Sequence, residues 1–144
     1  MMKVKVINKS NHRLPEYATP GSAGFDFKAN IDEPWVIHPM ERLLVPTGLY
    51  FELPEGYELQ IRPRSGLALK HGIGLANMVA TIDQDFSGEV KIILINLGKD
   101  NYVINPGDRI AQGIISPVVH AEFEEVSELS ETERGAGGFG HSGK

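Results

Sequence analysis

Glycine and proline interrupt this chain so often that long helices have little room in it. The 144 residues include 16 glycines and 9 prolines. They divide the sequence into pieces at about the 8–12-residue spacing expected of a β-sandwich or barrel. Residues 3–7, 25–28 and 58–62 alternate apolar with polar side chains, which is typical of a half-covered strand. The sequence therefore predicts an all-β protein.

Three further strands follow from the same patterns. Residues 89–96 begin by alternating and end as a continuous β-branched run, as a strand does when both of its faces are covered. We expect this strand to be central. Strands are also expected at 101–104 and 114–119, on either side of a turn at 105–108. At this spacing the chain holds roughly eight to ten strands.

One short helix is expected at 66–71. Ser65 is a candidate N-cap, the basic residues at 70 and 71 suit the negative C-terminal end, and Gly72 is placed to terminate the helix.

Composition indicates one domain with a core. Hydrophobic residues make up 41% of the chain and charged residues 23%, which is ordinary for a globular domain of this size. Cysteine is absent, so there is no disulfide, no thiolate zinc site and no cysteine nucleophile. No apolar stretch approaches the roughly 18 residues of a membrane span, and the N-terminus lacks the apolar region of a secretory signal. We expect a cytoplasmic protein.

The charge distribution argues against nucleic-acid binding. The net charge is −5, but six of the 19 acidic residues are glutamates between 122 and 133. The rest of the chain is nearly neutral, and its basic residues are scattered rather than gathered into the stripe that a nucleic-acid binder needs. The five histidines are also far apart, with no H-E-x-x-H pattern. The sequence predicts neither duplex binding nor a zinc site.

The last eleven residues, 134–144, contain five glycines and cannot fold alone. They match G-x-G-x-x-G and G-x-x-x-x-G-K, but the strand and helix that a nucleotide-binding fingerprint needs around it are missing. The simplest interpretation is a flexible terminus. Arg134 and Phe139 favour a second interpretation, in which residues 134–144 form an arm that closes over a ligand. The arginine would then contact a phosphate and the phenylalanine ring would stack on a base.

Three further segments carry residues suited to phosphate chemistry. Arg64 and Ser65 lie at the mouth of the expected helix, where free N–H groups favour an anion; an ordinary capped helix is the alternative. Asp83 follows an apolar residue in the polar, turn-rich segment 82–89, which is expected to be a hairpin between residues 75–77 and the central strand. Desolvation there would raise its pKa and suit it as a general base, whereas a plain acidic turn is the alternative. In 107–112 an Asp108–Arg109 pair is expected to organise a loop, and Gln112 is the unusual polar member.

In order and spacing, these segments resemble the five motifs of the homotrimeric dUTP pyrophosphatases (dUTPases). The matching stretches are 23–26, 63–68, 82–89, 107–112 and 134–140. The resemblance implies a β jelly roll over 1–133 with a flexible arm over 134–144 that closes the active site. It also implies a trimer whose three sites each draw on all three subunits. The reaction would convert dUTP and water into dUMP and pyrophosphate with Mg²⁺, keeping uracil out of DNA and supplying dUMP for thymidylate synthesis.

The resemblance also implies a role for each site residue. Asp83 would activate the water that attacks the α-phosphorus, and Asp26 would lie near the metal through water. The implied substrate-binding residues are Arg64, Ser65, Gly66, Asn77, Ile82, Phe86, Gln112, Arg134, Phe139 and Ser142. Of these, Arg64, Ser65 and Gln112 would hold the phosphates, Asn77 and the backbone around it the uracil, and Phe86 the deoxyribose. The arm would stack Phe139 on uracil and place Arg134 and Ser142 on the γ-phosphate.

Four departures from the family pattern involve five positions. Phe86 stands where tyrosine is usual and keeps the ring without the hydroxyl. Ala80 replaces a common glycine, Ser87 a frequent basic residue, and His141-Ser142 the usual Ser-Thr. These changes bear on affinity rather than on the reaction.

Three other functions fit parts of the sequence. A dCTP deaminase would share the fold but need a glutamate base and an amino-group pocket. A nucleotide-binding regulatory module would keep the pocket with little turnover. A sugar-binding jelly roll is the default for a small all-β chain, but it leaves Arg134 and Phe139 without a role.

Overall fold

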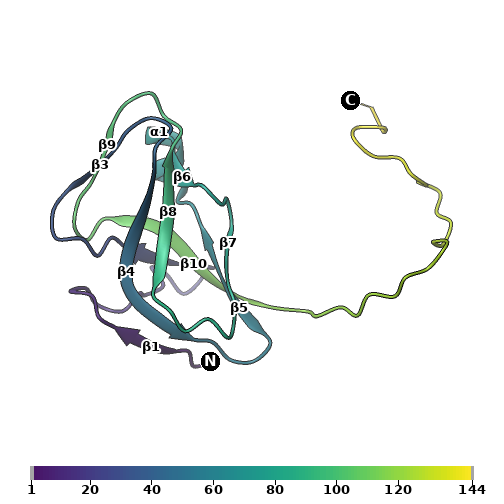
Figure 1. The fold of residues 1–144 in the computed structure, drawn as a ribbon, viewed down its shortest axis with the longest axis horizontal. Helices are drawn as coiled ribbons and strands as arrows, with labels where there is room; N and C mark the ends of the chain where they lie inside the picture. Colours follow the sequence, from purple (N-terminus) through teal and green to yellow (C-terminus); the bar gives the residue numbers. More distant parts are fainter. Residues whose placement is uncertain (1, 144) are drawn as a thin grey trace.

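The computed structural model describes residues 2–143, and in them the chain forms ten strands and one helix (Figure 1). In chain order the elements are β1 (Lys5–Asn8), β2 (Phe25–Lys28), β3 (Trp35–Ile37), β4 (Arg42–Glu52), β5 (Tyr57–Arg62), α1 (Ser65–His71), β6 (Ile73–Leu75), β7 (Ala80–Ile82), β8 (Val90–Asn96), β9 (Tyr102–Ile104) and β10 (Arg109–Pro117).

Two four-stranded antiparallel sheets enclose the core. One sheet has the order β1-β4-β8-β6 and the other β2-β10-β5-β7, while β3 and β9 form a separate pair. Alternate side chains of each sheet point inward, so fully buried residues come from both, among them Phe27 and Leu59 from one sheet and Leu94 from the other. Consecutive strands often lie in different sheets, which brings distant segments of the chain together.

The predicted central strand is confirmed. β8 pairs with β4 on one side and with β6 on the other. Its inward residues are buried, but its outward residues Ile93 and Ile95 are only half covered. Leu44, the direct partner of Ile93 on β4, is 54% exposed. One chain therefore leaves an apolar strip on the outer face of this sheet.

The longest strand, β4, was not predicted, because Pro46 and Gly48 within it look like strand breakers. The ladder shifts register between Pro46 and Leu49, and Gly48 has a φ of 70° at this bulge. The Glu89 carboxylate accepts the Gly48 N–H at 2.9 Å, and the Thr47 hydroxyl donates to the Val90 carbonyl at 2.6 Å. These bonds stabilise the bulge.

The short helix is confirmed, but its predicted N-cap is wrong. The capping residue is Arg64, which is extended and makes no side-chain capping bond, and Ser65 is the first helical residue. The Arg64 carbonyl accepts the Ala68 N–H at 3.0 Å, so the helix begins at Ser65, one residue earlier than the sequence suggested. Gly72 ends it as expected, with a φ of 68° and its N–H bonded to the Ala68 carbonyl at 3.0 Å.

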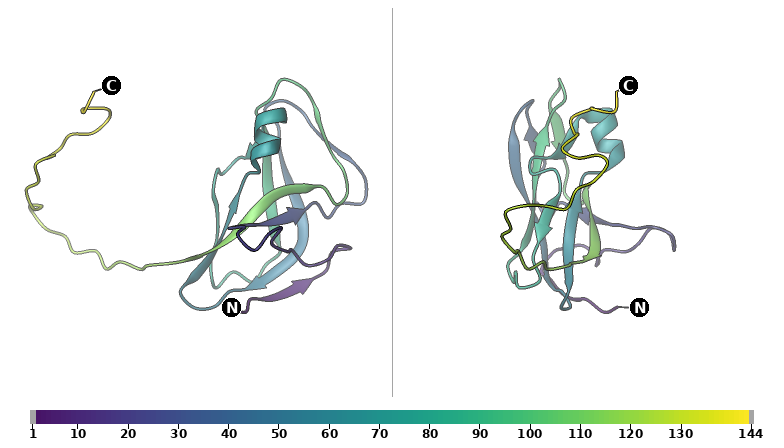
Figure 2. Two further views of the ribbon diagram at one scale, coloured as in Figure 1. Left: turned by 180° about the vertical axis from the view of Figure 1, so that it is seen from behind. Right: turned by 90° about the vertical axis from the view of Figure 1, so that its right-hand side faces the viewer.

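Residues 118–143 contain no helix or strand. After β10 the chain leaves the two sheets and curves away from them (Figures 1 and 2). Its turns are local, such as the bond from the His141 N–H to the Gly138 carbonyl at 3.1 Å. Within residues 2–143, no helix has the length and apolar character needed to cross a membrane.

Candidate active site

A cluster of charged and polar side chains lies where β2, β10 and the start of α1 meet. The Arg64 Nε donates to one Asp26 carboxylate oxygen at 2.9 Å, and the Arg109 Nη1 lies 3.4 Å from the other. A second bond runs from the Arg64 Nη1 to the Arg109 carbonyl at 3.3 Å. We call Asp26, Arg64, Arg109 and Gln112 the arginine cluster.

Strand register explains how the arginine cluster assembles. On β10, Gln112 pairs with Asp26 of β2 on one side and with Arg62 of β5 on the other. Its amide Nε2 donates to the Pro63 carbonyl at 2.8 Å, which fixes the bend from β5 into α1. A Cβ at Gly24 would lie 2.9 Å from the Gln112 Oε1, so glycine leaves room for this side chain.

The arginine cluster has a net positive charge and open donors. The Asp26 and Arg64 side chains are each about a quarter exposed, at 26% and 27%, whereas Arg109 is 57% exposed. Arg64 donates two of its five N–H groups to hydrogen bonds within the protein. The rest, with the exposed Ser65 and Gly66 beside them, can meet an anion.

The expected Asp108–Arg109 pair is wrong. The Asp108 carboxylate accepts the Asn105 N–H at 2.8 Å and closes the turn before β10. Arg109 starts a strand, so its side chain is directed away from that of its neighbour and meets Asp26 on the adjacent strand. The partner lies 83 positions away in the sequence.

Asn77, Ile82, Asp83 and Phe86 lie along the connection from β6 through β7 to β8. The predicted antiparallel pairing of the segment around Leu75 with the central strand is confirmed, since β6 pairs with β8. The connection between them is longer than a simple turn, because it includes β7, which pairs with β5 in the other sheet. The Phe86 N–H donates to the Asp83 carbonyl at 3.1 Å and closes a turn. Gly88 lies so close to the Phe86 ring that a Cβ there would be 2.7 Å away.

The predicted desolvation of Asp83 is also wrong for the single chain. Ile82 is half-buried on β7, and the next side chain points the other way, so Asp83 is exposed. It lines an open hollow of about 770 Å³ with polar neighbours that include Glu58 and Thr81. Only a further molecule or chain could remove this carboxylate from water.

One chain does not bring Asp83 and the arginine cluster together. Gln112 pairs with Arg62 at one end of β5, while Ile82, the neighbour of Asp83, pairs with Leu59. Asp83 is therefore level with Glu58, four residues from Arg62. At 3.2–3.4 Å per residue, the two groups are roughly 13 Å apart along the strand direction alone.

The arm residues are separate from both groups. The Arg134 Nε donates to the Gly137 carbonyl at 2.8 Å within the arm itself. Phe139 and Ser142 are exposed on the segment that curves away from the sheets. The described chain thus presents the predicted site as three separate parts.

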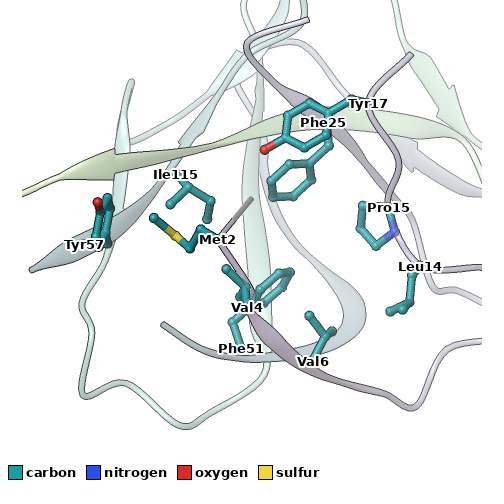
Figure 3. Close-up of a pocket in the computed structure, with 10 residues that line it drawn as sticks. All are labelled: Met2, Val4, Val6, Leu14, Pro15, Tyr17, Phe25, Phe51, Tyr57 and Ile115. Atoms are coloured by element: carbon teal, nitrogen blue, oxygen red, sulfur yellow. The ribbon is translucent and has the colours of Figure 1, made fainter. Parts of the chain in front are cut away.

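An apolar hollow of about 450 Å³ lies near the N-terminus (Figure 3). Its walls come from both sheets, with Val4 and Phe51 on one side and Phe25 and Ile115 on the other. Among residues 2–143, no charged side chain lines it. Because a triphosphate needs charge neutralisation, this hollow is not a candidate catalytic site.

Sequence reasoning missed Tyr102 on β9, which contacts the end of α1. Its ring centroid lies 4.8 Å from that of His71 at the end of α1. Burial raises the pKa of the Tyr102 phenol; the Asp108 charge raises it further and the Arg64 charge opposes this. The alternation of Tyr102 with Ile104 could have placed the ring on the inner face, but nothing in the sequence links it to His71.

Comparison with known proteins identifies the family to which this chain belongs. The model of the dUTPase family matches residues 10–143. The chain belongs to the dUTPase family. Its members include deoxyuridine 5′-triphosphate nucleotidohydrolases from Finegoldia magna, 55% identical over 99% of both chains, and from Chlamydia pneumoniae, 58% identical over 93% of both.

Solved dUTPase structures have a fold similar to that of this chain. The Staphylococcus bacteriophage 80alpha dUTPase with dUpNHpp is 27% identical, has a TM-score of 0.90 and covers all of both chains. A tyrosine-to-phenylalanine mutant of that phage enzyme with the same ligand is 28% identical, also with a TM-score of 0.90. The predictions of an all-β jelly roll with one short helix, of the dUTPase family and of a hydrolase are thereby confirmed. The roles of individual residues stay predictions.

Proposed function

We propose that this dUTPase acts as a homotrimer in which each active site combines three parts from three subunits. The observation that carries the proposal is the separation within one chain of the arginine cluster, Asp83 and the arm. Each part carries groups suited to one portion of dUTP, and none is complete alone. Assembly would join them around one substrate, which is hydrolysed to dUMP and pyrophosphate.

The arginine cluster is suited to the phosphate chain. Arg64, Ser65, Gly66 and Gln112 would bind the phosphates, and Asp26 would hold the Arg64 guanidinium in the required orientation. Phosphoryl transfer depends mainly on positioning and on neutralising charge, so a pre-oriented arginine contributes directly to it. No covalent nucleophile is needed.

Asp83 of a neighbouring subunit would act as the general base. Its exposure in one chain leaves the carboxylate free to accept a proton from a water molecule directed at the α-phosphorus. Covering by the substrate and the adjacent subunit would then remove bulk water from it. Asn77 and Ile82 of the same connection would contact uracil, and the Phe86 ring would pack on the deoxyribose.

The arm of the third subunit would close the site. Phe139 would stack on the uracil, and Arg134 and Ser142 would meet the γ-phosphate. A glycine-rich segment suits this task, because binding energy can order it only when base and triphosphate are both present.

Exposed apolar surface supports assembly. The Leu44–Ile93 strip on the outer face of one sheet and the apolar hollow of Figure 3 are both open in a single chain. Patches of this kind mark interaction sites in soluble proteins.

Mg²⁺ fits the site through the substrate rather than through a cage of carboxylates. No group of three or more metal-ligating side chains is close enough to hold an ion within residues 2–143, and both Asp26 oxygens face arginines. Mg²⁺ usually keeps several waters and takes other ligands from phosphates, so Asp26 would contact it through water. When bound, the ion supplies charge neutralisation on the phosphates.

The direct test measures pyrophosphate release from dUTP, dTTP, dCTP and UTP, each with and without Mg²⁺. We expect rapid pyrophosphate release from dUTP but not from dTTP, dCTP or UTP. This release should require Mg²⁺. In the cell this reaction would lower dUTP and supply dUMP. Release from all four nucleotides would contradict the uracil and deoxyribose contacts, and ammonia release from dCTP would indicate a deaminase.

A further inference from the structure

Helix α1 carries the start of the phosphate-binding segment, yet it buries almost nothing. None of its residues, Ser65–His71, is buried, and Leu67 is only partly covered against the core. A helix of two turns is not stable on its own. Its orientation must therefore come from the limited contact of Leu67 with the core and from contacts at its two ends.

At its first end, α1 is held by the Arg64–Asp26 bond already described. At its other end, the Gly72 carbonyl accepts the Leu97 N–H at 2.8 Å. Gly98 packs directly against the His71 carbonyl, so closely that a Cβ on Gly98 would collide with it. These contacts fix the backbone where α1 ends, while along the body of the helix Leu67 packs against the core and is only partly buried.

Tyr102 makes a further contact with the end of α1. It faces inward on β9, half-buried against the core, and its ring lies 4.8 Å from the His71 ring with the planes 47° apart. The Asp108 and Arg64 charges both act on its phenol. The side chain also lines one hollow together with Ala68, Lys70 and His71 of α1.

We propose that Tyr102 is a positioning residue that, by supporting α1 through its ring contact with His71, holds Arg64 and Ser65 in place for the phosphates. The inference rests on the proposed phosphate role of that segment. Displacement of a binding group by about 1 Å can cost up to 100-fold in rate, so a poorly supported helix should show a clear loss.

The test compares Tyr102→Ala and Tyr102→Phe with the wild-type protein. Val103→Ala is the matched control, because Val103 is the next residue on β9 and its side chain is 45% exposed. Binding is measured with two probes, dUpNHpp and deoxyuridine, of which only the first carries phosphates. Kinetics with dUTP separate KM from kcat.

We expect Tyr102→Ala to weaken dUpNHpp binding at least about tenfold and to raise the KM for dUTP by a similar factor. Deoxyuridine binding should stay unchanged. Tyr102→Phe and Val103→Ala should stay within about threefold of wild type, because neither removes the ring contact. Should Tyr102→Ala fail to fold, His71→Ala removes the same contact from the exposed side and should selectively weaken dUpNHpp binding.

Three outcomes would overturn the inference: equal weakening of both probes, unchanged dUpNHpp binding, or a Tyr102→Phe variant as impaired as Tyr102→Ala. Arg64→Ala separates this inference from the proposal on which it rests. If Arg64→Ala binds dUpNHpp normally, the phosphate role itself is wrong. If only Arg64→Ala is impaired, that role stands and the role of Tyr102 is wrong.

Discussion

Replacing Asp26 by asparagine tests how the arginine cluster is held. The new side chain has nearly the same shape and keeps one oxygen for the Arg64 Nε at 2.9 Å. Its amide nitrogen, however, would face the Arg109 Nη1 now 3.4 Å from a carboxylate oxygen. Two donors would then oppose each other, and no rotation of the side chain can satisfy both arginines.

The expected cost follows from burial. The Asp26–Arg64 bond joins two side chains that are about a quarter exposed. Asparagine would keep a neutral bond of about 0.5–1.5 kcal/mol in place of a charge-assisted one of about 1.5–3 kcal/mol, so the loss is the difference between them. The contact with Arg109, 57% exposed, adds less than about 1 kcal/mol. Freeing an arginine from one orientation restores up to about 2 kcal/mol of side-chain entropy, which the substrate must then overcome.

The weakened bonds of Asp26 and the restored side-chain entropy of Arg64 each correspond to about 2 kcal/mol, or roughly 30-fold in an equilibrium constant. Loss of the carboxylate also removes some repulsion of phosphate, but the two arginines already compensate this charge. We therefore expect kcat/KM for dUTP to fall about 10- to 30-fold.

Steady-state pyrophosphate release measures this effect, with Asp32→Asn as the control because it removes the same charge from an exposed position. If Asp26→Asn keeps full kcat/KM while Arg64→Ala loses it, Asp26 does not orient Arg64 and the reasoning is wrong.

Three further predictions concern Asp83, the arm and Tyr102. Asp83→Asn should lower kcat at least about 100-fold with little change in dUTP binding or stability, measured beside Asp85→Asn; a normal kcat would exclude the base role. Deletion of residues 134–144 should leave thermal unfolding and assembly unchanged but nearly abolish turnover, and full turnover would refute closure by the arm. Because burial raises the Tyr102 pKa above 10.0, the unfolded chain loses this proton first. The free energy of unfolding should therefore fall as pH rises above about 10. Denaturant titrations from pH 9 to 11 should show a shallower fall for Tyr102→Phe, and equal slopes would contradict the assignment.

Local patterns predicted the elements whose stability is local. β2 alternates cleanly, β8 begins by alternating and ends as a continuous apolar run, and α1 is delimited by Pro63 and Gly72. β4 escaped prediction because its proline and glycine occupy a bulge stabilised by Glu89, a residue 41 positions away from Gly48. A single sequence gives no direct sign of such a distant bond.

The candidate site was likewise predictable from the sequence only in part. Motif order indicated which residues matter, and the structure brings Asp26, Arg64 and Gln112 together as strand pairing requires. The Asp26–Arg109 contact was missed because sequence neighbours on a strand point to opposite sides, which makes Asp108 the wrong partner. The exposure of Asp83 and of the arm depends on how chains associate, which local patterns do not encode.

The central claim is that one active site needs several chains, and subunit mixing tests it most directly. Asp83→Asn chains and chains lacking residues 134–144 are each expected to be inactive. After joint unfolding and refolding at equal amounts, random trimers should recover about a quarter of wild-type activity, because half of the base positions and half of the arm positions are then intact and independent. Mixed trimers that form, as judged by native mass, yet show no activity would mean that base and arm come from the same chain.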